Sequence, residues 1–266
     1  MLLSDVLRQA YQENQCKGLP MQDIHWNTPV QPCLQKDILN IIPIVPGHFN
    51  PIHHGHVGLA LSAQDEFHRF TSHPSSIHFK TAIIASLFVP MSNRATTSKM
   101  RQSPEERWYY DFQSRMEFSH TFVQRYGDPS SFAAVNWTEY HMTRMMRSLE
   151  SVALTHGFHL RCLRVIGSDK ITNEPTVIAR NQVELDQVDT IVVKRSAPER
   201  KECRFNQVKY DCEPGQVLCV NGYCALVAAS LRPPTESATD IRRAVNAGCH
   251  SRDYDVLEEW QARVFL

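Results

Sequence analysis

The strongest constraint on the fold of this chain is a strand-like segment that runs directly into a helical one. Residues 38–45 (ILNIIPIV) are short, β-branched and almost continuously apolar, which predicts a strand covered on both faces of a sheet. A histidine-rich turn follows Pro46 and Gly47, and residues 57–70 then space their apolar side chains as a helix does. A buried strand followed by a turn and an amphipathic helix is the repeating unit of parallel α/β sheets.

The alternation of strand and helix continues along the chain. Further strands are expected at residues 81–89, 160–166 and 190–193, and a hairpin at 217–229 around Asn221-Gly222. Helices are expected at residues 4–12, 103–125, 137–155, 239–247 and 254–263, and polar loops at 91–103 and 196–210. We therefore predict an α/β fold with a Rossmann-like, mostly parallel sheet and helices on both faces. It forms a single domain, residues 38–266, after an N-terminal extension, residues 1–37.

Charge and hydropathy exclude several classes of protein. Lys and Arg total 28 and Asp and Glu total 28, so the chain lacks the basic excess of a general nucleic-acid binder. The longest largely apolar stretch, residues 82–89 with Ser86 within it, falls far short of the ~20 residues that a membrane span needs. The first residues show neither a basic segment nor a sustained apolar one, so no signal peptide is expected. We expect an intracellular protein, cytoplasmic or nuclear, that binds neither nucleic acid nor membrane.

Four of the eight cysteines lie close together, at positions 203, 212, 219 and 224. Zinc sites favour closely paired cysteines of the C-x2-4-C kind, whereas the gaps here are eight, six and four residues. Free core or hairpin thiols are therefore expected rather than disulfides, and a structural zinc site is the alternative.

The residues best suited to chemistry form the segment GHFNPIHHGH, residues 47–56. It lies where the first strand ends and the first long helix begins, which in open α/β sheets is where ligands bind. A helix N-terminus there favours phosphate, and His53 and His56 are spaced to share one helical face. Two imidazoles beside backbone donors would stabilise the charge of a phosphoryl group during transfer.

Two alternatives apply to this segment. Clustered histidines could bind a metal, but the segment contains no Cys, Asp or Glu to complete a site, so we expect no metal ligands. A covalent intermediate would need a nucleophilic Ser or Cys beside a base, and none is near. Direct phosphoryl chemistry is the better prediction.

The segment resembles the G-x-F-[DN]-P-x-H-x-G-H signature of the nucleotidylyltransferase superfamily. It is most similar to the nicotinamide and nicotinate mononucleotide adenylyltransferases. Three further blocks resemble that family in the same order: VIGSD at 165–169, IVVKR at 191–195 and SATDIR at 237–242. The resemblance implies adenylyl transfer between ATP and a pyridine mononucleotide, giving NAD or its acid analogue and pyrophosphate, with Mg²⁺ accompanying ATP.

The resemblance also implies a role for each matching residue. The catalytic residues would be His53, His56 and Arg242. The ATP-binding residues would be Gly47, His48, Phe49, His53, His56, Gly167, Asp169, Ser237, Thr239 and Arg242. The mononucleotide-binding residues would be Phe49, Lys99, Arg107 and Trp137.

Some of these roles have structural alternatives. Trp137 could belong to the core, Lys99 could be a solvated charge, and Arg107 could form a surface ion pair. The acceptor could instead be phosphopantetheine or a flavin, the reaction could be cytidylyl transfer, and a related protein could bind nucleotide without catalysis. Class I aminoacyl-tRNA synthetases share an H-x-G-H element, but the chain is short and shows no convincing K-M-S-K-S loop.

Overall fold

The computed structural model describes residues 1–14, 24, 26–72, 80–101, 110–125, 131–167, 178–180, 188–194, 214, 217–220 and 223–229. The strands are β1 (Leu39–Gly47), β2 (Thr81–Ile83), β3 (Ser86–Pro90), β4 (Phe132–Ala134), β5 (His159–Gly167), β6 (Ile178–Arg180), β7 (Val188–Lys194), β8 (Val217–Val220) and β9 (Tyr223–Ala229). The helices are α1 (Leu3–Glu13), α2 (His54–Ser72), α3 (Asn93–Met100), α4 (Phe112–Arg125) and α5 (Glu139–Thr155).

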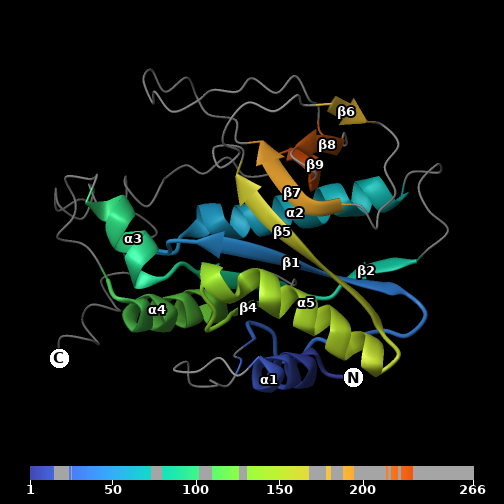
Figure 1. The fold of residues 1–266 in the computed structure, drawn as a ribbon, viewed down its shortest axis with the longest axis horizontal. Coiled ribbons are helices and arrows are strands. Elements are labelled where there is room, and N and C mark those ends of the chain that lie inside the picture. Colours follow the sequence, from blue (N-terminus) through green and yellow to red (C-terminus); the bar gives the residue numbers. More distant parts are fainter. Residues whose placement is uncertain are drawn as a thin grey trace.

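All strands in the described part of the chain belong to one sheet, drawn in Figure 1. Its order is β4-β3-β1-β5-β7-β9-β8-β6, and the short β2 pairs with the beginning of β1. The pairs from β4 to β9 are parallel, whereas β8 runs antiparallel to both β9 and β6. The predicted Rossmann-like α/β fold with a mostly parallel sheet is confirmed.

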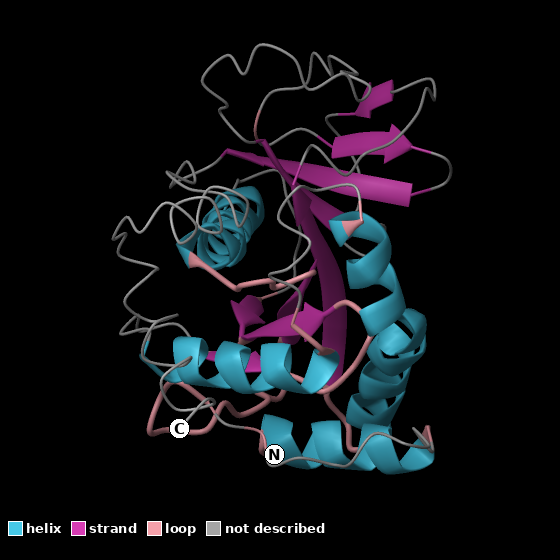
Figure 2. Cartoon of the chain, turned by 90° about the vertical axis from the view of Figure 1, so that its left-hand side faces the viewer, coloured by secondary structure: helices cyan, strands magenta, loops and turns pink. Residues whose placement is uncertain are grey.

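Helices cover both faces of the sheet, and β1 shows why its sequence is almost continuously apolar. Its side chains alternate between two cores: Ile41 and Val45 pack with α2 and α4, and Ile42 and Ile44 pack with α1 and α5. Figure 2 shows the helices on opposite sides of the sheet. Because both faces are buried, a strand in this position carries apolar residues at successive positions.

The N-terminal segment packs onto this sheet. Helix α1 buries Leu3, Val6, Leu7 and Ala10 in the core that α5 also lines. Further along, Trp26 forms a β-bridge with Ala133 of β4, and the backbone N–H of the next residue donates to the carbonyl of Phe132 at 3.1 Å. The described parts of residues 1–37 therefore cover one helical layer and the β4 edge.

The predicted strand at residues 81–89 is in fact two strands. β2 pairs with the first part of β1 and β3 with its last part, and Ile84 and Ala85 lie between them. The N–H of Ile84 still donates to the carbonyl of Ile41 at 3.0 Å. The chain therefore stays beside β1 through the interruption.

The prediction of a polar loop at residues 91–103 is wrong over most of its length, because residues 93–100 form α3. The Oγ of Ser92 accepts a hydrogen bond from the N–H of Ala95 and caps the helix. Only Thr96 and Met100 are buried, four residues apart, so the helix shows too short an apolar stripe for periodicity to detect.

The predicted hairpin is confirmed: β8 and β9 pair antiparallel on either side of Asn221-Gly222, and Cys219 lies opposite Cys224 in the register. Other predictions fall outside the described residues. These are the helix start at Ser103, the loop at 196–210, Cys203, Cys212 and the helices at 239–247 and 254–263.

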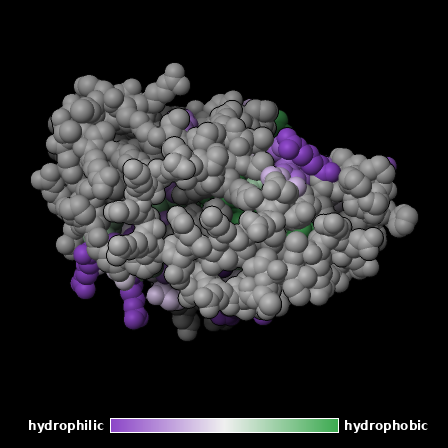
Figure 3. Space-filling model, turned by 90° about the horizontal axis from the view of Figure 1, so that it is seen from above, coloured by the Kyte–Doolittle hydropathy of each residue, from purple (hydrophilic) through white to green (hydrophobic). Residues whose placement is uncertain are grey.

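Within the described residues, no helix combines the length and the apolar character needed to cross a bilayer. Figure 3, a view from above, shows several hydrophilic side chains of described residues at the rim, with smaller hydrophobic areas between them and at one edge.

Candidate functional site: the histidine turn at the end of strand β1

The histidine turn, residues 47–56, lies at the carboxyl edge of the sheet. Gly47 is paired with Pro90 at the end of β3, and its carbonyl accepts a hydrogen bond from the N–H of Met91 at 2.8 Å. On the other side, the pairing of Ile44 with Arg164 places Gly167, the last residue of β5, at the same edge. The ends of three neighbouring parallel strands thus meet here, which is where α/β folds bind ligands.

Phe49 shapes the turn from inside. Its backbone has a φ of 47°, in the left-handed region, and its ring folds back over Gly47. A Cβ atom on Gly47 would lie 2.3 Å from Cε1 of Phe49, so only glycine fits at this position. The Phe49 ring is buried, with its centroid 6.0 Å from that of Phe88. It also meets the His56 ring edge-on at 4.9 Å, which fixes the orientation of that imidazole.

His53 and His56 form a pair whose ring centroids are 4.0 Å apart. The backbone N–H of His53 donates to Nδ1 of His56 at 3.2 Å, and that of Gly55 donates to Nδ1 of His53 at 3.1 Å. Because both Nδ1 atoms accept, each neutral ring carries its proton on Nε2. Both histidines are therefore held as Nε2 donors, the form suited to a phosphate oxygen.

The backbone at the start of α2 is already engaged. Besides the bond from Gly55 to the His53 ring, the N–H of His56 donates to the carbonyl of His53 at 2.9 Å. The positive end of the helix dipole remains beside the pair. Hydrogen bonds to an anion would therefore come from the two imidazoles rather than from these two amides.

The remaining histidine of the H-H-G-H run, His54, faces elsewhere. It is exposed, and its ring lies 5.3 Å from that of Phe122 in α4. The structure thus separates one surface histidine from the buried His53, which is 6% exposed, and the partly buried His56.

A buried arginine from α4 holds the other end of the turn. Arg115 is 1% exposed, and its Nη1 donates to the carbonyl of His48 at 2.7 Å. Its Nε donates to the carbonyl of Tyr110 at 3.0 Å and its Nη2 to Oδ1 of Asn93 at 3.2 Å. One guanidinium therefore joins the turn, α3 and the chain entering α4.

Asn50 makes a second set of links from the turn. Its Oδ1 accepts from the N–H of Tyr110 at 3.1 Å, and its Nδ2 lies 3.6 Å from the sulfur of Met100. The sequence did not single out Arg115 or Asn50. A charged residue in a predicted helix gives no sign of burial. Apart from the bond between Arg115 and the nearby Tyr110 carbonyl, the partners of both residues lie more than 20 residues away along the chain.

Helix α3 stands next to the turn and carries Lys99. Nδ1 of His48 and Oγ1 of Thr96 share a hydrogen bond of 3.3 Å. The Glu139 carboxylate, at the start of α5, accepts from the N–H of Ser92 at 2.6 Å and also from its hydroxyl. Lys99 is exposed in the last turn of this anchored helix, three residues after Thr96.

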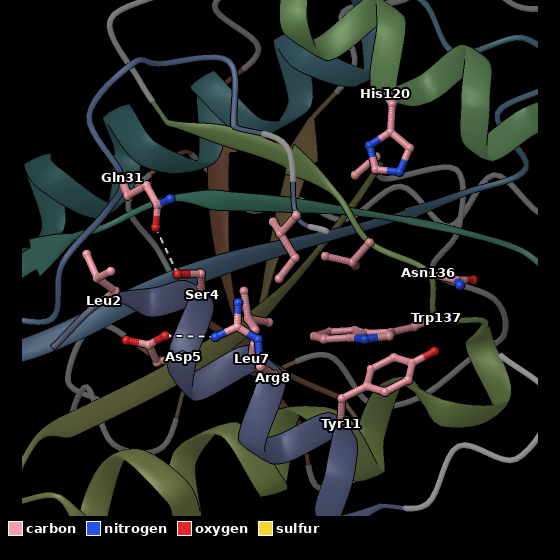
Figure 4. A pocket seen from close by; sticks show the side chains of 13 residues that line it. Leu2, Ser4, Asp5, Leu7, Arg8, Tyr11, Gln31, His120, Asn136 and Trp137 are labelled. Atoms are coloured by element: carbon pink, nitrogen blue, oxygen red, sulfur yellow. Dashed lines mark hydrogen bonds and ion pairs between the residues drawn. The ribbon is translucent and has the colours of Figure 1, made fainter. Parts of the chain in front are cut away.

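Trp137 lies in different surroundings. Its side chain is 2% exposed and belongs to the core that α1 and α5 share. It lines a cavity between α1 and the end of β4, shown in Figure 4, and no described residue of the histidine turn lines that cavity. The described contacts therefore group Gly47, Phe49, His53 and His56 together, and place Trp137 apart from them.

Five further residues that the sequence assigned to the site lie outside the described residues: Arg107, Asp169, Ser237, Thr239 and Arg242.

The described part of the chain contains no group of three or more His, Cys, Asp or Glu side chains able to hold a metal ion. The side chains gathered at the turn offer imidazole nitrogen, whereas Mg²⁺ prefers carboxylate, phosphate and water oxygens. The histidine turn does not fit Mg²⁺ as a protein-bound cofactor.

A scan against protein-family models gives no match for this chain, and a search of curated proteins gives none either.

Proposed function

We propose that the chain is a nucleotidyltransferase that joins the adenylyl group of ATP to a pyridine mononucleotide and releases pyrophosphate. The observation that carries the proposal is the His53–His56 pair. The two rings are 4.0 Å apart at the end of β1, and each has its Nδ1 occupied by a backbone donor. Two Nε2 donors at the positive end of α2 favour a phosphoryl group over a neutral ligand.

The reaction that suits this pair is a direct in-line displacement. An oxygen of the mononucleotide phosphate forms a bond to the α-phosphorus of ATP. The bond from that phosphorus to the oxygen bridging to the β-phosphorus breaks, and pyrophosphate leaves with the electron pair. No proton transfer is needed, so the work of the protein is positioning and charge stabilisation.

The residues of the histidine turn and of α4 would supply both the positioning and the charge stabilisation. His53 and His56 would donate to the non-bridging oxygens of the α-phosphoryl group, where negative charge must be stabilised. Phe49 and Arg115 would act as positioning residues, because both side chains are buried and they hold the His56 ring and the backbone of His48. Mg²⁺ would enter with ATP, as part of that substrate.

The identity of the acceptor rests on the resemblance of residues 47–56 and 237–242 to the mononucleotide adenylyltransferases. In the structure, the helix of Lys99 stands beside the turn, where a basic side chain could meet the acceptor phosphate. Amide and carboxylate forms of the pyridine ring differ by one charge. The residues assigned to the mononucleotide include no acidic side chain that would repel the carboxylate. We therefore expect both acceptors to be used, the amide at least as well.

The test is an assay of the full chain with MgATP and one acceptor at a time, followed by chromatography of dinucleotide and pyrophosphate. Nicotinamide and nicotinate mononucleotide should each give both products in equal amounts. Product from phosphopantetheine or a flavin mononucleotide, and none from the pyridines, would overturn the pyridine acceptor. Release of no pyrophosphate with any of these acceptors would overturn nucleotidyl transfer itself.

A further inference from the structure

The β8–β9 hairpin places two cysteines directly opposite each other. Cys219 of β8 is paired with Cys224 of β9, five positions further along the sequence. The neighbouring strands fix both positions from outside, because Cys219 is also paired with Ile178 of β6 and Cys224 with Val188 of β7. The juxtaposition therefore belongs to the sheet, near its β6 end in Figure 1, and not to an isolated hairpin.

The hydrogen-bonding pattern of a hairpin gives this pair the closer of the two strand spacings. Two residues connect Val220 to Tyr223, and a loop of that length closes on a hydrogen-bonded pair. Because the two kinds of pair alternate, Cys219 and Cys224 form a pair without mutual backbone hydrogen bonds. Opposite Cα atoms in such a pair are about 4.5 Å apart, within the range of about 4.4–6.8 Å found across disulfides. The backbone register thus permits a disulfide between the two residues.

The other cysteines in the described part of the chain lie away from this pair. Cys33 forms a β-bridge with Leu2 beside α1, which Figure 1 shows at the opposite end of the molecule from β8 and β9. Cys162 is paired with Ile42 inside the sheet, and β7 separates its strand from β9. Of the cysteines that the structure describes, only the two in the hairpin are placed to bond to each other.

The pair lies at the edge of the sheet opposite to the histidine turn. Cys224 is paired with Val188, the first residue of β7, whereas β7 ends at Lys194, opposite Ala229. Strands β1, β5 and β7 are parallel, so the beginning of β7 lies at the edge away from Gly47. A bond between the cysteines would fix the hairpin without touching the histidine turn. The inference therefore does not depend on adenylyl transfer.

We propose that Cys219 and Cys224 are a redox-active pair: thiols under reducing conditions, and a disulfide across β8 and β9 after oxidation by hydrogen peroxide. One thiolate attacks the peroxide, the O–O bond breaks, and a sulfenic acid forms while water leaves with the proton of the thiol. The second thiol attacks that sulfur, an S–S bond forms, and a second water leaves. Two thiols and one peroxide thus give one disulfide and two waters, with two electrons passing from sulfur to oxygen.

The test is a disulfide map of the full chain. The reduced protein is treated with hydrogen peroxide under native conditions, alkylated with N-ethylmaleimide and digested with trypsin and chymotrypsin. Chymotrypsin cleaves after Tyr223, between the two cysteines, so their peptides stay together only through a disulfide. The disulfide between Cys219 and Cys224 should exceed every other disulfide by about tenfold or more, because the register holds the two residues together. Dithiothreitol should return both thiols.

The same oxidation in urea separates the effect of the register from that of sequence distance. Cys219 is seven positions from Cys212 and five from Cys224. In an unfolded chain, loops of such similar length close with similar probability, so the preference for Cys224 should fall to about twofold. A preference as strong in urea as in the native chain would mean that sequence distance alone selects the pair, and it would overturn the proposal.

Single substitutions test the assignment by a second measurement. The oxidised native chain should unfold at a higher urea concentration than the reduced chain, because the bond restricts the unfolded state. Cys219→Ser and Cys224→Ser each leave one thiol of the pair, so peroxide should form no disulfide in the hairpin and should cause no such rise. Cys33→Ser, at an exposed cysteine outside the hairpin, is the matched control and should respond as the native chain does.

Three further results would overturn the proposal. They are a prevailing disulfide from either hairpin cysteine to another cysteine, oxidation of Cys33 with both hairpin thiols left intact, and an oxidised chain that unfolds at a lower urea concentration than the reduced one. Metal analysis of the reduced chain adds a fourth, since a zinc ion released on alkylation of Cys219 and Cys224 would make them metal ligands instead. If the serine variants fail to fold, the map of the native chain remains decisive.

Discussion

Nη1 of Arg115 donates a 2.7 Å hydrogen bond to the backbone carbonyl of His48, across 67 residues of sequence. The same guanidinium also bonds to the Tyr110 carbonyl and to Asn93. A buried charge with several oxygen partners is stable only while all of them stay in place. The position of the histidine turn is therefore tied to the packing of α4 on the sheet.

Arg115→Met should lower the free energy of unfolding by about 2–4 kcal/mol, because three oxygen atoms lose a buried, charged donor. Arg115→Lys should recover little of it, since one ammonium group cannot reproduce the fork of a guanidinium. Urea denaturation measures the free energy of unfolding of both variants. Arg94→Met, at an exposed arginine of α3, is the matched control and should change stability by less than about 0.5 kcal/mol. Equal effects at both positions would show that the Arg115 network contributes nothing.

His56→Ala should lower the rate of dinucleotide formation by ~100-fold or more while the fold remains, because one preorganised donor to the phosphoryl group is lost. His54→Ala removes the exposed neighbouring imidazole and should leave the rate within a few-fold of the native value. Steady-state rates with MgATP and nicotinamide mononucleotide give the comparison. A larger loss from His54→Ala than from His56→Ala would reverse the roles assigned to them.

Gly47→Ala should destabilise the protein by about 1–3 kcal/mol, because the new Cβ would lie 2.3 Å from the buried Phe49 ring. The loss should shrink when Phe49 is already leucine, which has no ring to clash. A double-mutant cycle of Gly47→Ala and Phe49→Leu, followed by denaturant unfolding, measures this coupling. Strictly additive losses would mean that the close approach of the two residues has no energetic weight.

The raised pKa of the Glu150 carboxyl predicts that the stability of the fold depends on pH. Burial raises the pKa of its carboxyl above the ordinary 4.5, although the backbone N–H of Cys162 donates to it at 2.8 Å and Arg161 is near. The folded chain therefore binds this proton more tightly than the unfolded chain does. The contribution of Glu150 to stability is largest below 4.5 and is lost as the pH rises through the raised pKa.

Glu150→Gln keeps an oxygen acceptor for Cys162 and cannot titrate. Relative to the native chain, the variant should therefore gain stability between about pH 4 and about pH 7, as measured by urea unfolding at both values. Glu117→Gln, at an exposed carboxylate of α4, controls for the loss of one charge. A relative loss of stability for Glu150→Gln over the same interval contradicts the direction of the shift.

Local sequence was enough to predict the strand, turn and helix that carry His53 and His56. There the hydrophobic period, the β-branched residues and the turn residues all predict the same elements. The apolar positions of β1 and α2 that define the period are the ones that pack in the core. The hairpin at Asn221-Gly222 was predictable for the same reason: its register depends on residues within a few positions of the turn.

The features that escaped prediction depend on partners far along the chain. Helix α3 is short, and Ser92 at its start is held by Glu139, 47 residues away. Asn50 meets Tyr110 across 60 residues. Trp137 faces a cavity only because α1, from the beginning of the chain, packs over the end of β4. Contacts of this kind form only when the helices and the sheet pack together, so the local sequence pattern does not predict them.

The bridge between Trp26 and Ala133 has a consequence for self-association. β4 is the last strand on its side of the described sheet, and an open edge of this kind can recruit a strand from another molecule. Here the chain's own early residues occupy that edge, with the N–H of Asn27 bonded to the carbonyl of Phe132 and its side-chain oxygen bonded to the Phe132 N–H. The segment before β1 thus blocks the β4 edge and keeps it from pairing with a strand of another molecule.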